Sequence, residues 1–178
     1  MSGVFGLWRL DGRPVAQAAC DEMSRLLAHR GPDGFGVWSD GPLGLGHRML
    51  RTTREAEREI QPLATADGDL VLTADTRIDN REALIVALGL RGLPREDITD
   101  ADLILASYRS WGERCAEHWI GDFALVIWDS RTRRLFCARD PFGVKPLYYH
   151  YTPGRIFAFA SEVEALLALE DVSDEIDE

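Results

Sequence analysis

The sequence is poor in lysine and cysteine, and it lacks long hydrophobic runs. Of its 20 basic residues 19 are arginine and only Lys145 is lysine, a bias that suggests a GC-rich bacterial genome. Cys20, Cys115 and Cys137 show no paired metal-ligand spacing, so the sequence predicts neither a disulfide framework nor a zinc site. No run approaches the roughly 18 apolar residues that span a bilayer, and the N-terminus lacks a signal-peptide pattern. These absences predict a soluble, cytoplasmic protein that makes no membrane contact.

The charge balance of the sequence does not indicate a nucleic-acid partner. The net charge is -10, and residues 162–178 hold eight acidic side chains and no basic one. The remaining 161 residues carry 20 positive and 30 - 8 = 22 negative charges, so the body of the protein is nearly neutral. The acidic run is typical of a solvated chain end. The Gly-rich stretch 41–46 lacks the Lys-Ser/Thr of a phosphate-binding loop, which argues against nucleotide binding there.

Hydrophobic periodicity predicts one globular domain of strands, then helices, then strands. A helix is expected to open at Pro14, a second has Asn80 as its N-cap, and capping boxes at 99–102 and 161–164 are expected to open a third and a short fourth. The links between strands have hairpin lengths, which favours two antiparallel sheets with helices outside them over a Rossmann-type parallel sheet. Strands are expected at 4–10, 35–38, 43–49, 70–74, 123–128, 134–138, 147–151 and 156–160.

The second residue has the chemistry of an N-terminal nucleophile. Removal of Met1 would leave a free α-amine next to the hydroxyl of Ser2, and an amine with a pKa near ~8 can act as the general base for its own side chain. A cysteine there would be partly thiolate near neutral pH, whereas a serine hydroxyl must lose its proton in the transition state. Ser2 is therefore expected to be a weaker nucleophile or an inactive one.

A series of short motifs resembles one family, the N-terminal glutaminase-type domain of asparagine synthetases. The resemblance covers residues 2–168 and implies the four-layer αββα fold of N-terminal nucleophile hydrolases. Residues 169–178 are then an acidic tail, or the start of a linker to an ATP-binding synthetase domain. The motifs are Phe5-Gly6, 29–33 (HRGPD), 46–48 (GHR), 61–63 (QPL), Asp100, Trp111-Gly112, 121–124 (GDFA), 139–149 (RDPFGVKPLYY) and 159–162 (FASE).

The resemblance also implies where a glutamine pocket would lie. The family uses a cysteine nucleophile, an arginine for the glutamine carboxylate, an Asn-Gly-Glu segment for the oxyanion and substrate, and an aspartate for the substrate amine. Only the aspartate is retained here, as Asp100. The other positions align with Ser2, with Met49 next to Arg48, and with Asp75, Thr76 and Arg77.

These replacements predict a domain that has lost glutaminase activity. Loss of one oxyanion donor alone can slow an enzyme ~10²- to 10³-fold, and a methionine cannot provide the bidentate grip of an arginine. Asp75 would place a negative charge where an oxyanion should form. Similar degenerate domains are expected in β-lactam synthetases and in lasso-peptide macrolactam synthetases, whose substrates supply their own attacking amine.

The run 73–81 (TADTRIDNR) looks more like the lasso-peptide cyclases. The resemblance implies a synthetase domain or subunit that binds ATP and Mg²⁺ through a Ser-Gly-Gly-x-Asp-Ser loop and acts on a precursor peptide. That loop is absent from this sequence, so no cofactor is expected in this chain.

Two other interpretations stay open: an active amidohydrolase that uses Ser2 and Asp100, and the N-terminal domain of a β-lactam synthetase-like enzyme. Lys145 is expected to be structural or to lie at a domain interface, with Asp140 and Arg139 pairing locally. His29 and His47 are expected to be structural. The aromatic residues Trp8, Trp111, Trp119, Tyr148 and Tyr149 are expected in the core.

Overall fold

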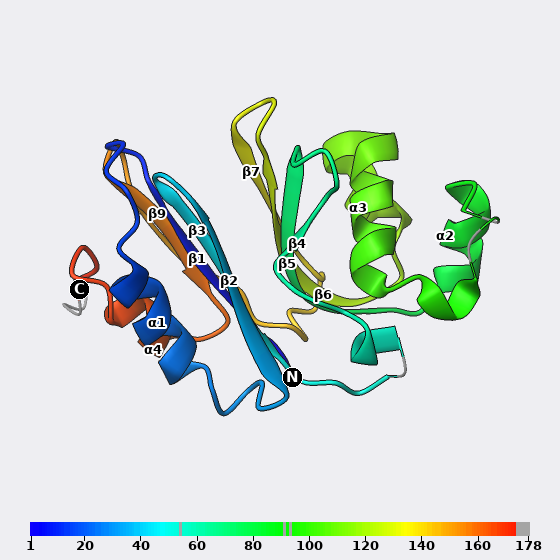
Figure 1. Ribbon diagram of the computed structural model, residues 1–178, viewed down its shortest axis with the longest axis horizontal. Coiled ribbons are helices and arrows are strands. Elements are labelled where there is room, and N and C mark those ends of the chain that lie inside the picture. Colours follow the sequence, from blue (N-terminus) through cyan, green and yellow to red (C-terminus); the bar gives the residue numbers. More distant parts are fainter. Residues whose placement is uncertain (54, 91, 93, 174–178) are drawn as a thin grey trace. The chain divides into compact units, whose positions relative to one another are not determined.

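The structure is a computed structural model that describes residues 1–53, 55–90, 92 and 94–173. The chain forms two compact units, one from Met1–Leu50 together with Pro146–Glu178 and the other from Arg51–Lys145. Each unit is an antiparallel sheet with helices on one face (Figure 1). This arrangement confirms the predicted α+β class with two antiparallel sheets.

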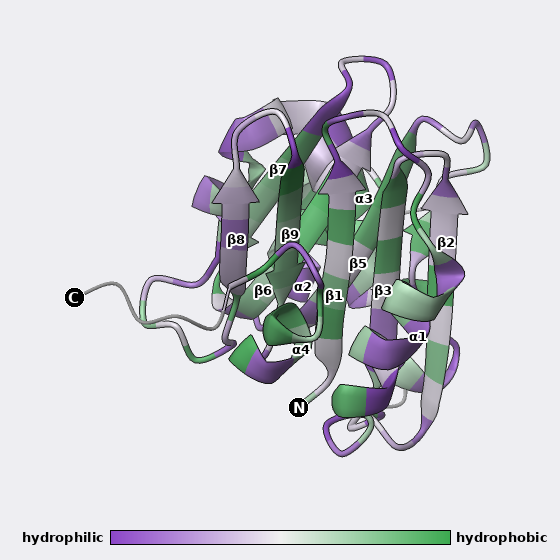
Figure 2. Cartoon of the chain, turned by 90° about the vertical axis from the view of Figure 1, so that its left-hand side faces the viewer, coloured by the Kyte–Doolittle hydropathy of each residue, from purple (hydrophilic) through white to green (hydrophobic). Residues whose placement is uncertain are grey.

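The first unit contains a five-stranded sheet in the order β2-β3-β1-β9-β8. Figure 2 shows this sheet face-on, with α1 (Gln17–Leu26) and α4 (Val163–Leu167) lying in front of it. The first helix begins at Gln17, three residues later than the predicted start at Pro14. The elements are β1 (Gly3–Arg9), α1 (Gln17–Leu26), β2 (Gly34–Asp40), β3 (Leu43–Met49), β8 (Tyr148–Thr152), β9 (Ile156–Ala160) and α4 (Val163–Leu167).

Alternation along β1 determines which side chains enter the core of the first unit. Phe5 and Leu7 belong to the same buried cluster as Met23 and Leu27 of the α1 segment. The neighbouring strand in the sheet, β3, has Gly46 opposite Phe5. A Cβ atom at this position would lie only 2.0 Å from the ring carbon Cζ of Phe5. The glycine at this β3 position therefore allows the sheet to pack against its helices.

The second unit contains a four-stranded sheet in the order β4-β5-β6-β7. Even-numbered residues of β5, such as Leu70 and Leu72, share a buried cluster with Leu103 and Ile104 of α3. Odd-numbered residues point to the opposite face because side chains alternate along a strand. The elements are η1 (Glu55–Glu57), β4 (Leu63–Ala64), β5 (Leu70–Ile78), α2 (Arg81–Ala87), η2 (Arg95–Asp97), α3 (Asp100–Trp111), η3 (Gly112–His118), β6 (Gly121–Asp129) and β7 (Arg134–Arg139).

Helix starts were predicted with mixed success. The capping box at Thr99 is confirmed: its hydroxyl accepts from the Asp102 N–H, and the Asp102 carboxylate accepts from the Thr99 N–H. Asn80 precedes α2 as predicted, but its side chain does not cap the helix. Its amide instead donates to the carbonyl of His118 and accepts from the N–H of Ile120. The predicted capping box at Ser161 is wrong, because that hydroxyl accepts from the N–H of Val4, 2.9 Å away.

Two further expectations require correction. β5 extends to Ile78, four residues beyond the predicted strand end, because it pairs with β6 over nine residues. Tyr148 and Tyr149 are 46% and 71% exposed, so they are not core residues. Among the described helices, none is both long and apolar enough to cross a membrane.

Candidate functional site

Ser2 lies at the start of β1 and is buried, with 7% of its surface exposed. Its hydroxyl oxygen accepts a hydrogen bond from the backbone N–H of Leu50 at 3.0 Å. Its carbonyl oxygen accepts from Nε of Arg30, also at 3.0 Å. The first unit therefore fixes both the backbone and the side chain of the nucleophile position.

Arg30 connects Ser2 to a second group of residues. Its Nη1 donates to a carboxylate oxygen of Glu162 at 3.1 Å, and Nε2 of His29 lies 3.0 Å from the same oxygen. Burial would raise the pKa of Glu162, but the hydrogen bonds from Arg30 and His29 outweigh it and lower that pKa. Sequence reasoning did not assign this network, although two of the family motifs, 29–33 and 159–162, contain its members.

Arg48 does not occupy the place of the missing carboxylate-binding arginine. Met49 follows it on β3, so the two side chains lie on opposite faces of the strand. Nε of Arg48 donates to the carbonyl of Ser24 in α1 at 2.8 Å, and its guanidinium carbon lies 4.8 Å from the centroid of the Phe35 ring. Arg48 is therefore held on the helix-covered face, and the opposite face has the uncharged Met49, which is 5% exposed.

His47 precedes these residues on β3 and is 1% exposed. Burial lowers its pKa to about 3, so the imidazole is neutral at physiological pH. This burial agrees with the expectation of a structural histidine.

In the second unit, Asp75 forms an ion pair with Lys145, the only lysine of the chain. Nζ of Lys145 donates to Oδ1 of Asp75 at 2.9 Å, and the two side chains are 13% and 5% exposed. The charge expected at Asp75 is therefore part of an ion pair, and its cationic partner lies 70 residues away in the sequence.

The loop that places Lys145 is organised by the carboxylate of Asp140. Oδ1 accepts the backbone N–H groups of Phe142 and Val144, and Oδ2 accepts that of Lys145, at 3.0 to 3.1 Å. Burial opposes ionisation, but these backbone hydrogen bonds together lower the pKa of Asp140. The predicted local pairing with Arg139 is replaced by backbone hydrogen bonds.

Thr76 and Arg77 complete the segment that aligns with Asn-Gly-Glu, and their side chains lie on opposite faces of β5. Thr76 lies on the face of β5 that α3 covers, and its hydroxyl is buried without a hydrogen-bond partner among the described residues. Arg77 lies on the opposite face, and its Nε donates to Asp79 at 2.9 Å. Its side chain is 71% exposed, so this pair is a surface interaction.

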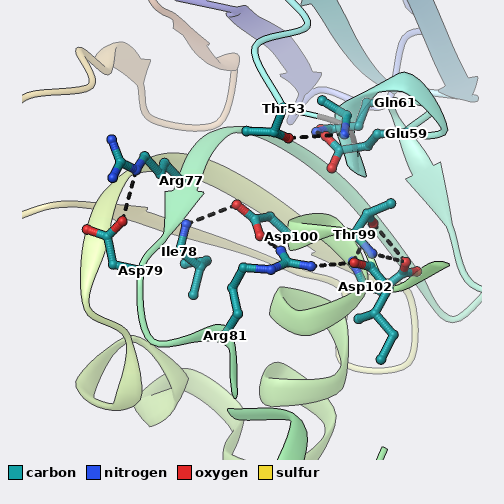
Figure 3. Close-up of polar contacts among 12 residues, drawn as sticks. Thr53, Glu59, Gln61, Arg77, Ile78, Asp79, Arg81, Thr99, Asp100 and Asp102 are labelled. Carbon is teal, nitrogen blue, oxygen red and sulfur yellow. Dashed lines mark hydrogen bonds and ion pairs between the residues drawn. The ribbon is translucent and has the colours of Figure 1, made fainter. Parts of the chain in front are cut away.

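Both carboxylate oxygens of Asp100, the first residue of α3, already have partners (Figure 3). Oδ2 accepts the N–H of Ile78 at 2.9 Å, and Oδ1 accepts from Nη1 of Arg81. Arg81 also donates to the carbonyl of Ile98. Asp100 thus joins the end of β5 to the starts of α2 and α3.

Gln61 fixes β5 one residue before Asp75. Its side-chain amide accepts from the N–H of Ala74 at 2.6 Å and donates to the Ala74 carbonyl at 3.0 Å. The same amide nitrogen donates to Glu59 (Figure 3), whose pKa is raised by burial. The motif at 61–63 therefore has a structural basis in strand positioning.

The structure places a buried serine hydroxyl at the start of the first unit and paired charges in the second. Within the described ranges, no three His, Cys, Asp or Glu side chains are grouped as metal ligands. The described residues thus form an α+β domain class with two antiparallel sheets, each flanked by helices, and with a small hydroxyl residue just before the first strand.

Comparison with known proteins identifies the family. The chain belongs to the glutamine amidotransferase domain family, whose sequence profile matches residues 1–178. The solved glutamine phosphoribosylpyrophosphate amidotransferase from B. subtilis resembles 92% of this chain with a TM-score of 0.71 and 20% identity, covering 42% of that protein. This likeness confirms the predicted fold.

Similar curated proteins are mostly named asparagine synthetases. Asparagine synthetase [glutamine-hydrolyzing] 3 of Bacillus subtilis is 37% identical over 88% of this chain, which spans 26% of that protein. A putative asparagine synthetase [glutamine-hydrolyzing] 2 of Methanocaldococcus jannaschii is 32% identical over 97% of this chain and 36% of its own length. The chain therefore spans only about a quarter to a third of these relatives.

Proposed function

We propose that this glutamine amidotransferase domain does not hydrolyse glutamine and serves as a structural part of an ATP-dependent amide ligase. The Asp75–Lys145 ion pair is the main support for the loss of activity. Amide hydrolysis builds negative charge on an oxygen, and catalysis needs hydrogen-bond donors aimed at it. An ionised aspartate offers only acceptors, and the ammonium of Lys145 already donates to Asp75.

The residues expected to bind glutamine support the same proposal. Met49 offers no charge for a carboxylate, and Arg48 is bonded to Ser24 on the other face of β3. Asp100 could attract an ammonium group, but Arg81 already neutralises it. A free amino acid would have to displace these internal partners without gaining a bidentate contact.

The purified protein incubated with L-glutamine tests this proposal directly. We expect no release of ammonia or glutamate above that of a Ser2→Ala control. Ser2→Cys alone should not create activity, because the donors and the carboxylate-binding arginine would still be missing. Glutamine turnover by the unaltered protein that Ser2→Ala abolishes would falsify the proposal and favour a serine-dependent amidohydrolase.

For the ligase as a whole we propose a lasso-peptide cyclase. The relatives named glutamine-hydrolyzing asparagine synthetases are three to four times longer than this chain, which leaves room for a synthetase domain. The run 73–81 favours the cyclases, in which a separate ATP- and Mg²⁺-binding domain activates an Asp or Glu side chain of a precursor peptide. An amine of the same peptide then closes the ring, so no ammonia from glutamine is required.

Co-expression with the matching synthetase polypeptide and its precursor peptide tests this role. Mass spectrometry should detect a product lighter by one water, formed with ATP, without glutamine, and equally well with Ser2→Ala. A requirement for glutamine or ammonia would contradict the cyclase proposal. A β-lactam product from a small substrate would instead assign the chain to that branch of the family.

A further inference from the structure

The edge of the first sheet has a groove that the proposed chemistry does not use. Among the described residues, β8 pairs only with β9, so its outer edge has no strand partner. Figure 2 shows β8 at the side of the sheet with α4 close to its lower end. A groove of about 350 Å³ runs between them, and its lining includes Tyr148, His150, Val163, Leu166, Leu167 and Val172.

This groove is apolar and open to solvent. Tyr148, Val163 and Leu167 are each 45 to 46% exposed. Natural sheets protect their edges with charged residues, proline or a covering segment. The edge strand β7 of the other sheet has an arginine at each end, whereas β8 reads Tyr-Tyr-His-Tyr-Thr and has neither a charge nor a proline. Such an edge is suited to pairing with another extended segment.

Charge indicates the chemistry of that segment. Residues 162–178 contain no basic side chain. Within the described part of this stretch, Glu162 and Asp171 are paired with basic residues of the same unit, while the exposed Glu164 and Glu170 form no ion pair. A second copy of this chain placed edge to edge would bring its own acidic α4 segment to the same surface. Complementarity therefore favours a partner that is both apolar and basic.

We propose that the β8–α4 groove binds an extended segment of the synthetase polypeptide, which adds a strand to β8 and carries a large apolar side chain flanked by Lys or Arg. The apolar side chain would lie against Tyr148 and Leu167, and the basic groups would face Glu164 and Glu170. This inference rests on the proposed function, since that function supplies the partner.

Binding between this chain and the synthetase, supplied as a separate polypeptide, provides the test. Leu167→Lys should weaken binding roughly tenfold, because it removes apolar contact and adds a charge that repels a basic segment. Val163→Lys should act in the same direction. The double variant Glu164→Lys, Glu170→Lys should mainly slow association, roughly three- to tenfold, and should reduce its salt dependence.

Matched controls lie on the second unit. Val86→Lys replaces an apolar residue of similar exposure, 48%, and Glu57→Lys reverses an exposed acidic charge. Both should bind within about twofold of the unaltered chain, and backbone amides of β8 should gain protection from hydrogen exchange in the complex. Normal binding by all groove variants would overturn the groove assignment alone. Absence of binding by the unaltered chain would contradict both this inference and the proposed structural role.

Discussion

In the unit that contains Ser2, the replaced positions have uncharged side chains, whereas in the unit that contains Asp75 the replacements are mostly charged. Ser2 and Met49 add no charge to their surroundings. Asp75 and Arg77 each have an oppositely charged partner, and so does the retained Asp100. The comparison distinguishes two kinds of replacement: uncharged side chains in the first unit, and charged side chains engaged in internal ion pairs in the second.

This difference predicts that the second unit tolerates change less well. Lys145→Met should lower the free energy of unfolding by about 3–5 kcal/mol, because it leaves the 5%-exposed carboxylate of Asp75 without its cation. Urea unfolding measures the effect. Arg77→Met is the matched control, and it should change stability by less than about 1 kcal/mol because its pair with Asp79 is exposed. Equal effects of the two substitutions would contradict the proposed difference.

Substitution of Asp140 should cause the second-largest loss of stability. Asp140→Ala removes an acceptor of three backbone N–H groups and should cost about 2–3 kcal/mol. Because the pKa of Asp140 is lowered in the folded state, its contribution is present above the ordinary pKa of 3.8 and is lost as the pH falls through the lower folded value. The variant should therefore show a smaller loss of stability upon acidification. If the variant and the unaltered protein lost the same stability at low pH, this role of Asp140 would be contradicted.

In the first unit, the largest predicted effect on stability comes from His47, and this effect depends on pH. Its folded pKa of about 3 lies below the ordinary 6.5, so the unfolded chain takes up a proton that the folded chain excludes. Stability should therefore fall as the pH drops below 6.5, by about 1–2 kcal/mol between pH 7 and pH 5. His47→Leu should flatten this slope in urea titrations. A slope unchanged by the substitution would show that another group is responsible.

The smallest effect is expected at Ser2. Ser2→Cys should change stability by less than about 0.5 kcal/mol and should not produce glutamine turnover. Combining it with Asp75→Asn, Thr76→Gly and Arg77→Glu restores the nucleophile and the Asn-Gly-Glu segment of the family pattern, and the loss of stability should come mainly from Asp75→Asn, which leaves Lys145 without its partner. If the first-unit changes proved the more destabilising, the comparison between the units would fail.

Local sequence was sufficient to predict most of the elements but not their side-chain partners. The period-2 and helical patterns located the main strands and helices, and the capping box at Thr99 depends only on residues three apart. The failures involve distant partners. Ser161 resembles a helix cap in sequence, but its hydroxyl bonds to Val4, 157 residues away.

The candidate site shows the same contrast between what local sequence predicts and what depends on distant partners. The roles predicted for Ser2, Asp75 and Asp100 came from their alignment with the family. The pairing of Asp75 with Lys145 spans 70 residues and depends on the loop that Asp140 organises, so no local pattern could reveal it. The position of Arg48 on the helix-covered face required only strand alternation, which was available from the sequence.

A solitary, shielded lysine also makes this chain a convenient subject for chemical labelling. Reagents that acylate primary amines meet only two such groups in it, the N-terminal amine and Nζ of Lys145. While the ion pair holds, acylation should be confined to the N-terminal amine, and a second adduct should appear only when the fold opens. The mass of the labelled first peptide would then also reveal whether the initiator methionine has been removed.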